Sequence, residues 1–213
     1  MTSPYVLYGA WLSGPTYKVA LMMSLLGERF DYVHVDLRSA AQKQPAYLQL
    51  NRFGQAPCLL DTASGLALCQ SGSILQYLAS KSGKLGGKTD EEGIRAREWI
   101  LWDFDRFAPN VYRPRAQKLG FRPAHESTLA MYMEDGNAAL KVLDHWLEGQ
   151  RWLAREEPTI ADIDVYGVVS YATEAGFDLG CYANLSGWIG RLQTLPGFRP
   201  AEELLPRESR KAS

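Results

Sequence analysis

Residues 51–74 read NRFGQAPCLLDTASGLALCQSGSI, and this stretch decides how the first part of the chain folds. It holds two short apolar runs, Pro57–Leu60 and Leu66–Cys69, which are separated by the polar, glycine-ending segment Asp61–Gly65. This spacing predicts a β-hairpin. A helix is predicted to follow the hairpin at once, beginning near Ser71.

The residues before this hairpin predict two strands that alternate with two helices. The strands are predicted at Tyr5–Tyr8 and Tyr32–Val35, and the helices at Thr16–Leu26 and Pro45–Leu50. Gly27 lies where a C-cap glycine is expected after the first helix. Together with the hairpin and the helix after it, the order β-α-β-α-β-β-α predicts a small α/β domain over residues 1–83.

The remainder of the chain has the apolar spacing of helices. They are predicted at Asp90–Ala108, Glu126–Leu147 and Leu185–Leu195, and Thr159 with Asp162 has the spacing of a capping box at the start of another. The glycine- and lysine-containing segment 84–88 is predicted to be a linker. An all-helical domain is therefore expected over residues 89–213.

Composition narrows the class of protein. The chain has 213 residues, a formal net charge of -1 and 46% hydrophobic residues, which is ordinary for a globular protein. We expect no nucleic-acid or membrane partner, because there is no basic excess and no apolar run of membrane-spanning length. Three cysteines without disulfide or zinc spacing, and no recognisable signal peptide, lead us to expect a cytoplasmic protein without a metal site.

Two features of the hairpin region suggest a binding site for a peptide. If the Ala56–Pro57 bond is cis, the backbone N–H and C=O of Ala56 are left free to pair with an extended ligand. Gln70 and Ser71 lie at the start of a helix, where backbone N–H groups and the local dipole attract a carboxylate. Taken alone, each feature also has a structural interpretation: Pro57 opens a strand, and Ser71 caps its own helix.

Ser13 lies between the first predicted strand and the first predicted helix. Loops in this position bind ligands in open α/β sheets. The hydroxyl group would donate to a thiolate and lower the pKa of the corresponding thiol. The alternative interpretation, that Ser13 only caps the helix, is open at this point.

Taken together and in this order, the motifs resemble those of the cytosolic glutathione transferases. Asn51–Pro57 resembles the family segment Asn-Pro-x-Gly-x-Val-Pro, and Gln70–Ile74 resembles Glu/Gln-Ser-x-Ala-Ile. Leu7–Gly9 followed by Ser13–Val19 resembles the opening of bacterial, serine-type members, and Thr159–Asp162 resembles a buried capping box. The resemblance covers nearly the whole chain.

The resemblance implies a thioredoxin-like domain followed by an all-helical one, usually in a homodimer, with glutathione as co-substrate. The residues implied in glutathione binding are Gln55, Ala56, Pro57, Gln70 and Ser71. Ala56 would bind the cysteinyl part, Gln70 and Ser71 the γ-glutamyl end, and Gln55 would lie near the glycyl carboxylate. Ser13 would face the sulfur, and Tyr8 is the alternative for that role.

Some residues depart from the family pattern. Arg52 replaces a proline and Ala56 replaces a valine, and no cysteine stands at the position of Ser13, which disfavours a cysteine-based disulfide exchanger. The candidates for an electrophile pocket are Trp11, Leu12, Phe107, Tyr112 and Arg113. A stripe that includes Trp102 and Arg106 on the long helix is typical of either core or a surface facing a cleft or partner.

The main hypothesis is a detoxifying glutathione transferase that activates the glutathione thiol for attack on a small electrophile. One alternative is a glutathione-dependent disulfide or peroxide reductase on the same scaffold. Another is a non-catalytic, transferase-like stress or interaction protein, which predicts weak glutathione binding.

Overall fold

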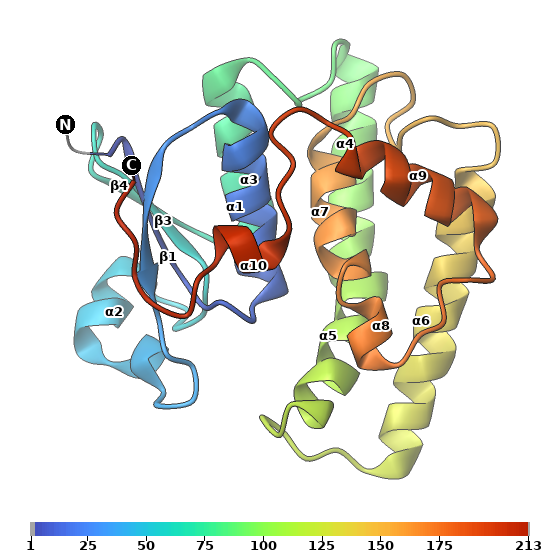
Figure 1. Ribbon diagram of the computed structural model, residues 1–213, viewed down its shortest axis with the longest axis horizontal. Helices are drawn as coiled ribbons and strands as arrows, with labels where there is room; N and C mark the ends of the chain where they lie inside the picture. Colours follow the sequence, from blue (N-terminus) through green and yellow to red (C-terminus); the bar gives the residue numbers. More distant parts are fainter. Residues whose placement is uncertain (1–2, 213) are drawn as a thin grey trace. The chain divides into compact units, whose positions relative to one another are not determined.

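Four strands form one mixed sheet in the part of the chain that the computed structural model describes, residues 3–212. They are β1 (Tyr5–Gly9), β2 (Phe30–His34), β3 (Cys58–Asp61) and β4 (Leu66–Cys69), in the spatial order β2-β1-β3-β4 (Figure 1). β1 runs parallel to β2 and antiparallel to β3, and β3 is antiparallel to β4. This confirms the predicted thioredoxin-like order of strands and helices.

Helices pack on both faces of this sheet. They are α1 (Gly14–Leu26), α2 (Pro45–Leu50) and α3 (Ser71–Ser82), with the short turns η1 (Ala41–Lys43) and α10 (Ala201–Leu204). Because side chains alternate along a strand, Tyr5 and Leu7 are buried on one face, where α1 and α3 pack together. Tyr8 points the other way and packs against a cluster that contains Tyr47 of α2.

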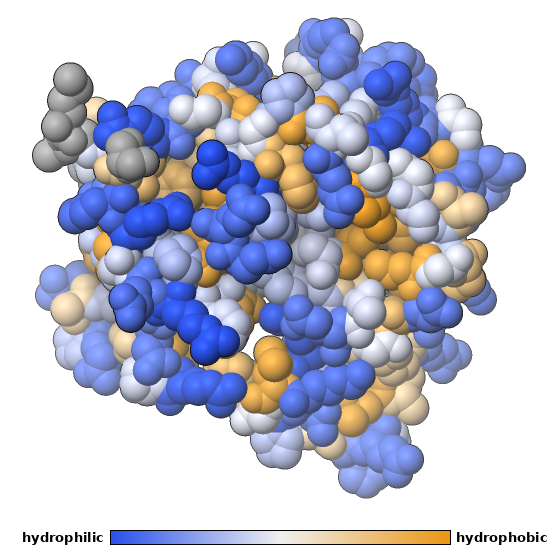
Figure 2. Space-filling view, viewed as in Figure 1, coloured by the Kyte–Doolittle hydropathy of each residue, from blue (hydrophilic) through white to orange (hydrophobic). Residues whose placement is uncertain are grey.

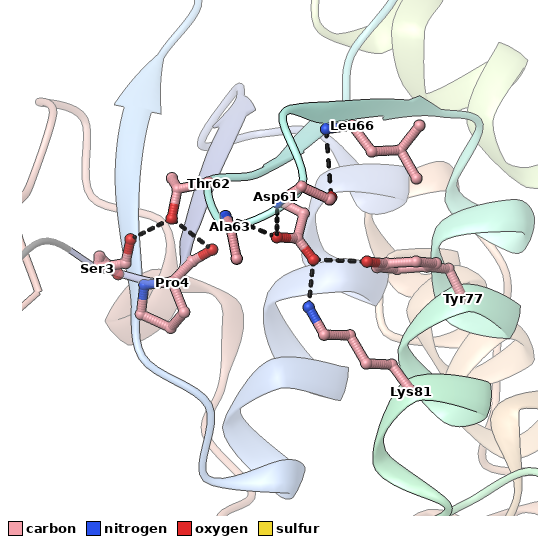
Figure 3. Close-up of polar contacts among 9 residues, drawn as sticks. Ser3, Pro4, Asp61, Thr62, Ala63, Leu66, Tyr77 and Lys81 are labelled. Atoms are coloured by element: carbon pink, nitrogen blue, oxygen red, sulfur yellow. Dashed lines mark hydrogen bonds and ion pairs between the residues drawn. The ribbon is translucent and has the colours of Figure 1, made fainter.

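A buried carboxylate ties the turn of the hairpin to α3 (Figure 3). Asp61, which is 0% exposed, accepts hydrogen bonds from the N–H groups of Ala63 and Ser64 and from the hydroxyl of Tyr77, and it forms an ion pair with Lys81. Hydrogen bonds from Lys81 and Tyr77 hold the pKa of Asp61 well below its usual range. The predicted hairpin is thus anchored by its own first turn residue.

The C-terminal segment lies along the outer strand β2, which the sequence did not lead us to expect. Arg210 and Tyr32 exchange backbone hydrogen bonds of 2.8 and 2.7 Å, forming an antiparallel bridge. Ser209 accepts from the N–H of His34, and Lys211 pairs with Asp31 at 2.8 Å. The edge strand β2 is therefore covered, which is how many proteins protect sheet edges.

Contacts divide the chain into two compact units. One consists of the residues up to Ser82 together with those from Leu195 onward, and the other is Gly83–Thr194. The grouping of the last residues with the first unit differs from the predicted division into residues 1–83, 84–88 and 89–213, which stays a prediction. The second unit is helical throughout, with α4 (Asp90–Trp102), η2 (Asp103–Phe107), α5 (Ala108–Lys118), α6 (Glu126–Trp146), α7 (Ile160–Val169), α8 (Ala172–Ala175) and α9 (Ala183–Gln193).

The expected end of the first long helix at Ala108 is wrong. A π-helical turn, η2, follows α4, and the chain continues as α5 to Lys118. Pro109 is tolerated because it lies in the first turn of α5, where its missing N–H group is not needed. Proline is therefore a poor stop signal here.

The predicted capping box at the start of α7 is confirmed. Thr159 accepts from the N–H of Ala161, and the Asp162 carboxylate accepts from the N–H of Thr159 at 2.8 Å. Asp162 also accepts from the N–H of Leu153 and from the indole of Trp188, both at 2.9 Å. Burial raises the pKa of Asp162, and these donors oppose that effect, so the residue organises the helical core.

Candidate functional site

Strand direction brings the predicted glutathione-binding segments to one edge of the sheet. The register pairs Tyr8 of β1 with Cys58 of β3, and Cys58 with Cys69 of β4. The end of β1, the start of β3 and the end of β4 therefore lie side by side. The loop that carries Ser13, the loop before Pro57 and the start of α3 all leave the sheet at this edge.

The loop before β3 is shaped by Asn51, whose side chain is fully buried. Its amide nitrogen donates to the carbonyl oxygens of Gln55 at 2.5 Å and Pro57 at 3.3 Å, and its amide oxygen accepts from the N–H of Phe53 at 3.0 Å. The hydroxyl of Tyr47 donates to the same Gln55 carbonyl at 2.8 Å. Asn51 belongs to the motif Asn51–Pro57, but nothing in the sequence itself indicates this role.

The Ala56–Pro57 peptide bond is cis. Within residues 3–212, neither the N–H nor the C=O group of Ala56 makes a hydrogen bond, although the residue is only half-exposed. Backbone groups that are not used internally are available to pair with an extended peptide, as an added strand would.

Gln70, and not Ser71, precedes the first turn of α3. The Gln70 carbonyl accepts from the N–H of Ile74 at 3.0 Å, and the Gln70 backbone is left-handed with φ at 69°. The Gln70 side chain donates to the side-chain oxygen of Gln55 at 2.9 Å. Two of the predicted binding residues are thus in direct contact.

The structural interpretation of Ser71 as the cap of its own helix is wrong, because Ser71 is the first helical residue. Its side chain is 2% exposed, and its hydroxyl has no hydrogen-bond partner in the part of the chain that the structure describes. Buried hydroxyls are nearly always satisfied, so an orphan at a helix start points to a ligand or water as its partner.

Ser13 caps α1. Its hydroxyl oxygen accepts from the N–H of Thr16 at 3.2 Å, and the residue is 9% exposed. The structural interpretation left open above is thus realised. The hydroxyl can still donate a hydrogen bond, because the cap uses only an oxygen lone pair. Within residues 3–212 the Ser13 hydroxyl donates to no acceptor.

Tyr8 lies on the opposite side of β1 from α1. Its ring packs edge-on against Tyr47 of α2, with centroids 6.4 Å apart, and joins the cluster around Cys58. Trp11 and Leu12 immediately precede Ser13; Trp11 is 36% exposed and carries the Arg207 guanidinium 4.6 Å above its ring.

The other predicted pocket residues belong to the helical unit. Phe107 is fully buried and stacks on Trp102, and the hydroxyl of Tyr112 donates to the Gly167 carbonyl at 2.8 Å. Burial raises the pKa of Tyr112 well above its usual value. Arg113 is exposed, and its guanidinium donates to the hydroxyl of Tyr132 on α6 at 3.1 Å.

Arg113 also lines a groove of about 670 Å³ between η2, α5 and α6. Exposed apolar side chains occur on η2 and α6, namely Phe104, Met131 and Val142, and Leu101 is exposed at the end of α4. In the face drawn in Figure 2, hydrophobic residues gather at several places over the helical unit, between hydrophilic ones. Within the predicted stripe on the long helix, Asp103 is buried and Arg106 is exposed, so the stripe has both a buried and an exposed side.

Residues 3–212 contain neither a cluster suited to a metal ion nor a helix suited to spanning a membrane. No group of three or more His, Cys, Asp and Glu side chains there is arranged to hold a metal ion. No described helix is both long and apolar enough to cross a membrane.

Two family models match this chain. The N-terminal domain of glutathione S-transferase matches residues 3–80, and the C-terminal domain of glutathione S-transferase matches residues 114–196. The chain is 30% identical to glutathione S-transferase 3 of Zea mays over an alignment of 217 residues, and this alignment covers 96% of each protein. It is 27% identical over 189 residues to the disulfide-bond oxidoreductase YfcG of Escherichia coli (strain K12), covering 84% of this chain and 86% of that protein. A crystal structure of a possible glutathione S-transferase from Rhodopseudomonas palustris is 32% identical with a TM-score of 0.88, covering 94% of this chain and 98% of that one.

Proposed function

This chain belongs to the glutathione S-transferase family and is a glutathione transferase, and from that premise we propose that Ala56-Pro57 holds glutathione and Ser13 activates its thiol. The observation that carries the proposal is the orphan hydroxyl of Ser71, at the same sheet edge as the unused backbone groups of Ala56. Leaving such a buried hydroxyl unpaired costs about 1–3 kcal/mol, which a bound carboxylate would recover.

Glutathione lies extended in this proposal. Its cysteinyl part pairs with the backbone N–H and C=O of Ala56, and Pro57 fixes the turn beneath it. The γ-glutamyl carboxylate accepts from the Ser71 hydroxyl and the N–H groups that begin α3, where the helix dipole favours an anion. Gln70 contacts the γ-glutamyl end, and Gln55 lies toward the glycyl carboxylate.

Ser13 then faces the sulfur. A thiol with a pKa near 8.5 is only a few per cent ionised at pH 7, and lowering that pKa by about two units stabilises the thiolate by roughly 2.7 kcal/mol. The hydrogen of the Ser13 hydroxyl is free to donate to the thiolate, because the cap to Thr16 uses only the oxygen. The thiolate attacks an electrophilic carbon, and most of the acceleration comes from the larger thiolate fraction and from positioning.

Packing favours Ser13 over Tyr8. Ser13 stands at the end of the sheet in the loop before α1, whereas Tyr8 packs against Tyr47 on the α2 face. A tyrosine in that cluster turns its ring toward α2 rather than toward the loop that carries Ser13. We therefore assign the serine-type role to Ser13 and keep Tyr8 as the alternative that mutation tests.

The electrophile contacts remain the five predicted residues. Trp11, Leu12 and Arg113 carry this part of the proposal best, because each keeps exposed or half-exposed surface. Phe107 is fully buried in the helical unit and Tyr112 is held by Gly167, so these two would act by supporting α5. An apolar substrate with an electrophilic carbon suits side chains such as those of Trp11 and Leu12.

We also propose a cytoplasmic homodimer with a role in detoxification. The exposed apolar side chains of α4, η2 and α6 support self-association, because patches of this kind mark protein interfaces. Sedimentation or light scattering at micromolar concentration measures the expected mass of two chains.

Two experiments test the function. Calorimetry with millimolar glutathione should give saturable binding, and its absence would refute the proposal. Conjugation of a chloro-dinitro aromatic should then exceed turnover of a mixed disulfide.

A glutathione-dependent disulfide reductase is the second candidate function. The observation that favours it is the 27% identity to the Escherichia coli disulfide-bond oxidoreductase. It predicts the opposite order of rates in the assay with a chloro-dinitro aromatic and a mixed disulfide. Absence of any cysteine at position 13 means that bound glutathione itself would supply the exchanging thiolate.

A further inference from the structure

Cys58 and Cys69 lie directly opposite each other on the neighbouring strands β3 and β4. Both are free thiols. Each sulfur donates to the carbonyl oxygen of Leu50, and both distances are 3.6 Å. The two thiols therefore converge on one acceptor.

Backbone hydrogen bonding makes this a favourable position for a disulfide. Residues of an antiparallel strand direct their backbone groups alternately to the two neighbouring strands. Thr62 donates to the Pro4 carbonyl, toward the β1 side, at 3.0 Å, so by alternation Cys58 also directs its groups toward β1. Cys58 and Cys69 thus form a non-hydrogen-bonded pair, whose Cα atoms lie about 4.5 Å apart, within the range that disulfides span.

The two thiols differ in access. Cys58 is 0% exposed, and burial together with the neighbouring Cys69 raises the pKa of its thiol to about 12. Cys69 is half-buried at the end of β4. Cys69 is therefore the thiol that meets a disulfide from solution, and Cys58 is placed to resolve the product.

Both cysteines are covalently joined to the proposed glutathione site. Cys58 follows Pro57, and Cys69 precedes Gln70. Their shared acceptor, Leu50, precedes Asn51, which holds the carbonyls of Gln55 and Pro57. A change at the pair is thus transmitted directly to both sides of the site.

We propose that Cys58 and Cys69 form a reversible intramolecular disulfide, and that this oxidation weakens glutathione binding. With glutathione disulfide as oxidant, the Cys69 thiolate attacks one sulfur, forming a mixed disulfide and releasing one glutathione as its thiolate. The Cys58 thiolate then attacks the Cys69 sulfur and releases the second glutathione. Two protein thiols are oxidised and one glutathione disulfide is reduced to two glutathione molecules, with the two thiol protons passing to the released thiolates.

Weaker binding follows from the loss of both donors to Leu50. Oxidation removes the two S–H groups that satisfy this carbonyl, so the segment Leu50–Asn51 must readjust, and the loop that Asn51 shapes moves with it. The effect on affinity rests on the proposed function, whereas the formation of the disulfide does not. By linkage, a bound glutathione analogue must protect the thiols by the same factor.

The first arm of the test follows oxidation by intact mass. The Cys181→Ser variant leaves only the pair, because Cys181 is exposed and lies elsewhere. It is equilibrated with graded ratios of glutathione to glutathione disulfide and then alkylated in denaturant. We expect loss of two hydrogen atoms and of both alkylation sites at the most oxidising ratios. Two alkylated thiols in the most oxidising buffers, or a stable glutathione adduct in place of the internal disulfide, would overturn the proposal.

Single variants test the order of attack in the same background. With Cys58→Ser, we expect Cys69 to retain one glutathione as a mixed disulfide, because the resolving thiol is gone. With Cys69→Ser, we expect Cys58 to remain unmodified. The reverse pattern contradicts the assigned roles.

The second arm measures affinity with S-methylglutathione, which has no thiol to reduce the protein. We expect binding at least about five-fold weaker after oxidation, and no such change in a Cys58→Ser, Cys69→Ser double variant exposed to the same oxidant. Equal affinity of the two redox forms would overturn the coupling. Absence of binding to the reduced protein would instead refute the proposed function, while the mass measurement still decides on the disulfide.

Discussion

The side-chain amide of Gln70 donates a hydrogen bond of 2.9 Å to the side-chain oxygen of Gln55. The bond joins the start of α3 to the loop before β3, across the two ends of the hairpin. It links residues that the proposed function assigns to the γ-glutamyl and glycyl ends of one ligand. Each side chain thus holds the other in place before glutathione arrives.

Replacing Gln70 should therefore weaken glutathione binding. Gln70→Gly is the suitable change, because the left-handed backbone, with φ at 69°, strains alanine but not glycine. We expect the Kd for glutathione to rise about ten-fold, or about 1.4 kcal/mol, in calorimetry.

A double-mutant cycle tests whether the hydrogen bond between Gln55 and Gln70 contributes to glutathione binding. Gln55→Ala and Gln70→Gly should be non-additive, since either change removes the shared hydrogen bond. Strict additivity would show that the two side chains act independently on the ligand.

Ser71→Ala should lower the affinity for glutathione without lowering stability. The hydroxyl is buried without a partner in the described chain, so its removal should leave the free energy of unfolding unchanged or raise it by up to about 1 kcal/mol. Glutathione affinity should fall about ten-fold or more, because the bound carboxylate loses its donor. Urea unfolding of the ligand-free protein and calorimetry measure the two effects.

Ser73→Ala is the matched control, because Ser73 lies on the same helix with an exposed side chain. It should alter neither quantity. Loss of stability in Ser71→Ala without loss of affinity would mean that its hydroxyl serves the fold alone.

Ser13→Gly should separate capping from catalysis. Glycine is nearly as good an N-cap as serine, so the free energy of unfolding should fall by only a few tenths of a kcal/mol. We expect kcat/KM for conjugation to fall about ten- to hundred-fold at pH 7, because the bound thiol loses its donor and its pKa rises. The deficit should shrink as pH rises above the pKa of the thiol, which a pH–rate profile measures.

Tyr8→Phe tests the alternative. Since the ring packs against Tyr47 and phenylalanine preserves that contact, we expect activity within about two-fold of the unaltered enzyme. A large loss in Tyr8→Phe, combined with an active Ser13→Gly, would transfer the catalytic role to Tyr8.

Local signals in the sequence were sufficient for the hairpin, the order of elements and the capping box at Thr159. Each of these depends on residues close together in the chain, such as the turn that ends in Gly65. They also predict which end of the sheet carries the site, because strand direction follows from the order of the elements. The sequence could not show the bridge between Tyr32 and Arg210, since nothing local marks a pairing between such distant residues.

The roles of Asn51 and Ser71 depend on burial and on unused hydrogen-bonding capacity. An asparagine in a loop has many local partners to choose from, and only the fold shows that Asn51 donates to Gln55 and Pro57. Ser71 at a helix start predicts a cap on composition alone. A one-residue shift of the helix start turns that cap into an orphan hydroxyl.

Asp61→Asn should destabilise the protein in a pH-dependent way. The carboxylate is fully buried, pairs with Lys81 and accepts from Tyr77, so we expect the free energy of unfolding to fall by about 2–4 kcal/mol at pH 7. Because the pKa of Asp61 is lowered in the folded state, its contribution is present above the unfolded value of about 3.9 and is lost as pH falls through the lower, folded value. The difference between the two proteins should thus be constant from pH 7 to about pH 5 and should shrink below about pH 4.

Asp105→Asn is the control, because the ion pair of Asp105 with Arg106 is exposed on both sides and should contribute less than about 1 kcal/mol at any pH. Urea unfolding across this pH range measures both variants, and a loss in Asp61→Asn that persists undiminished in acid would show that packing, not charge, holds the hairpin to α3.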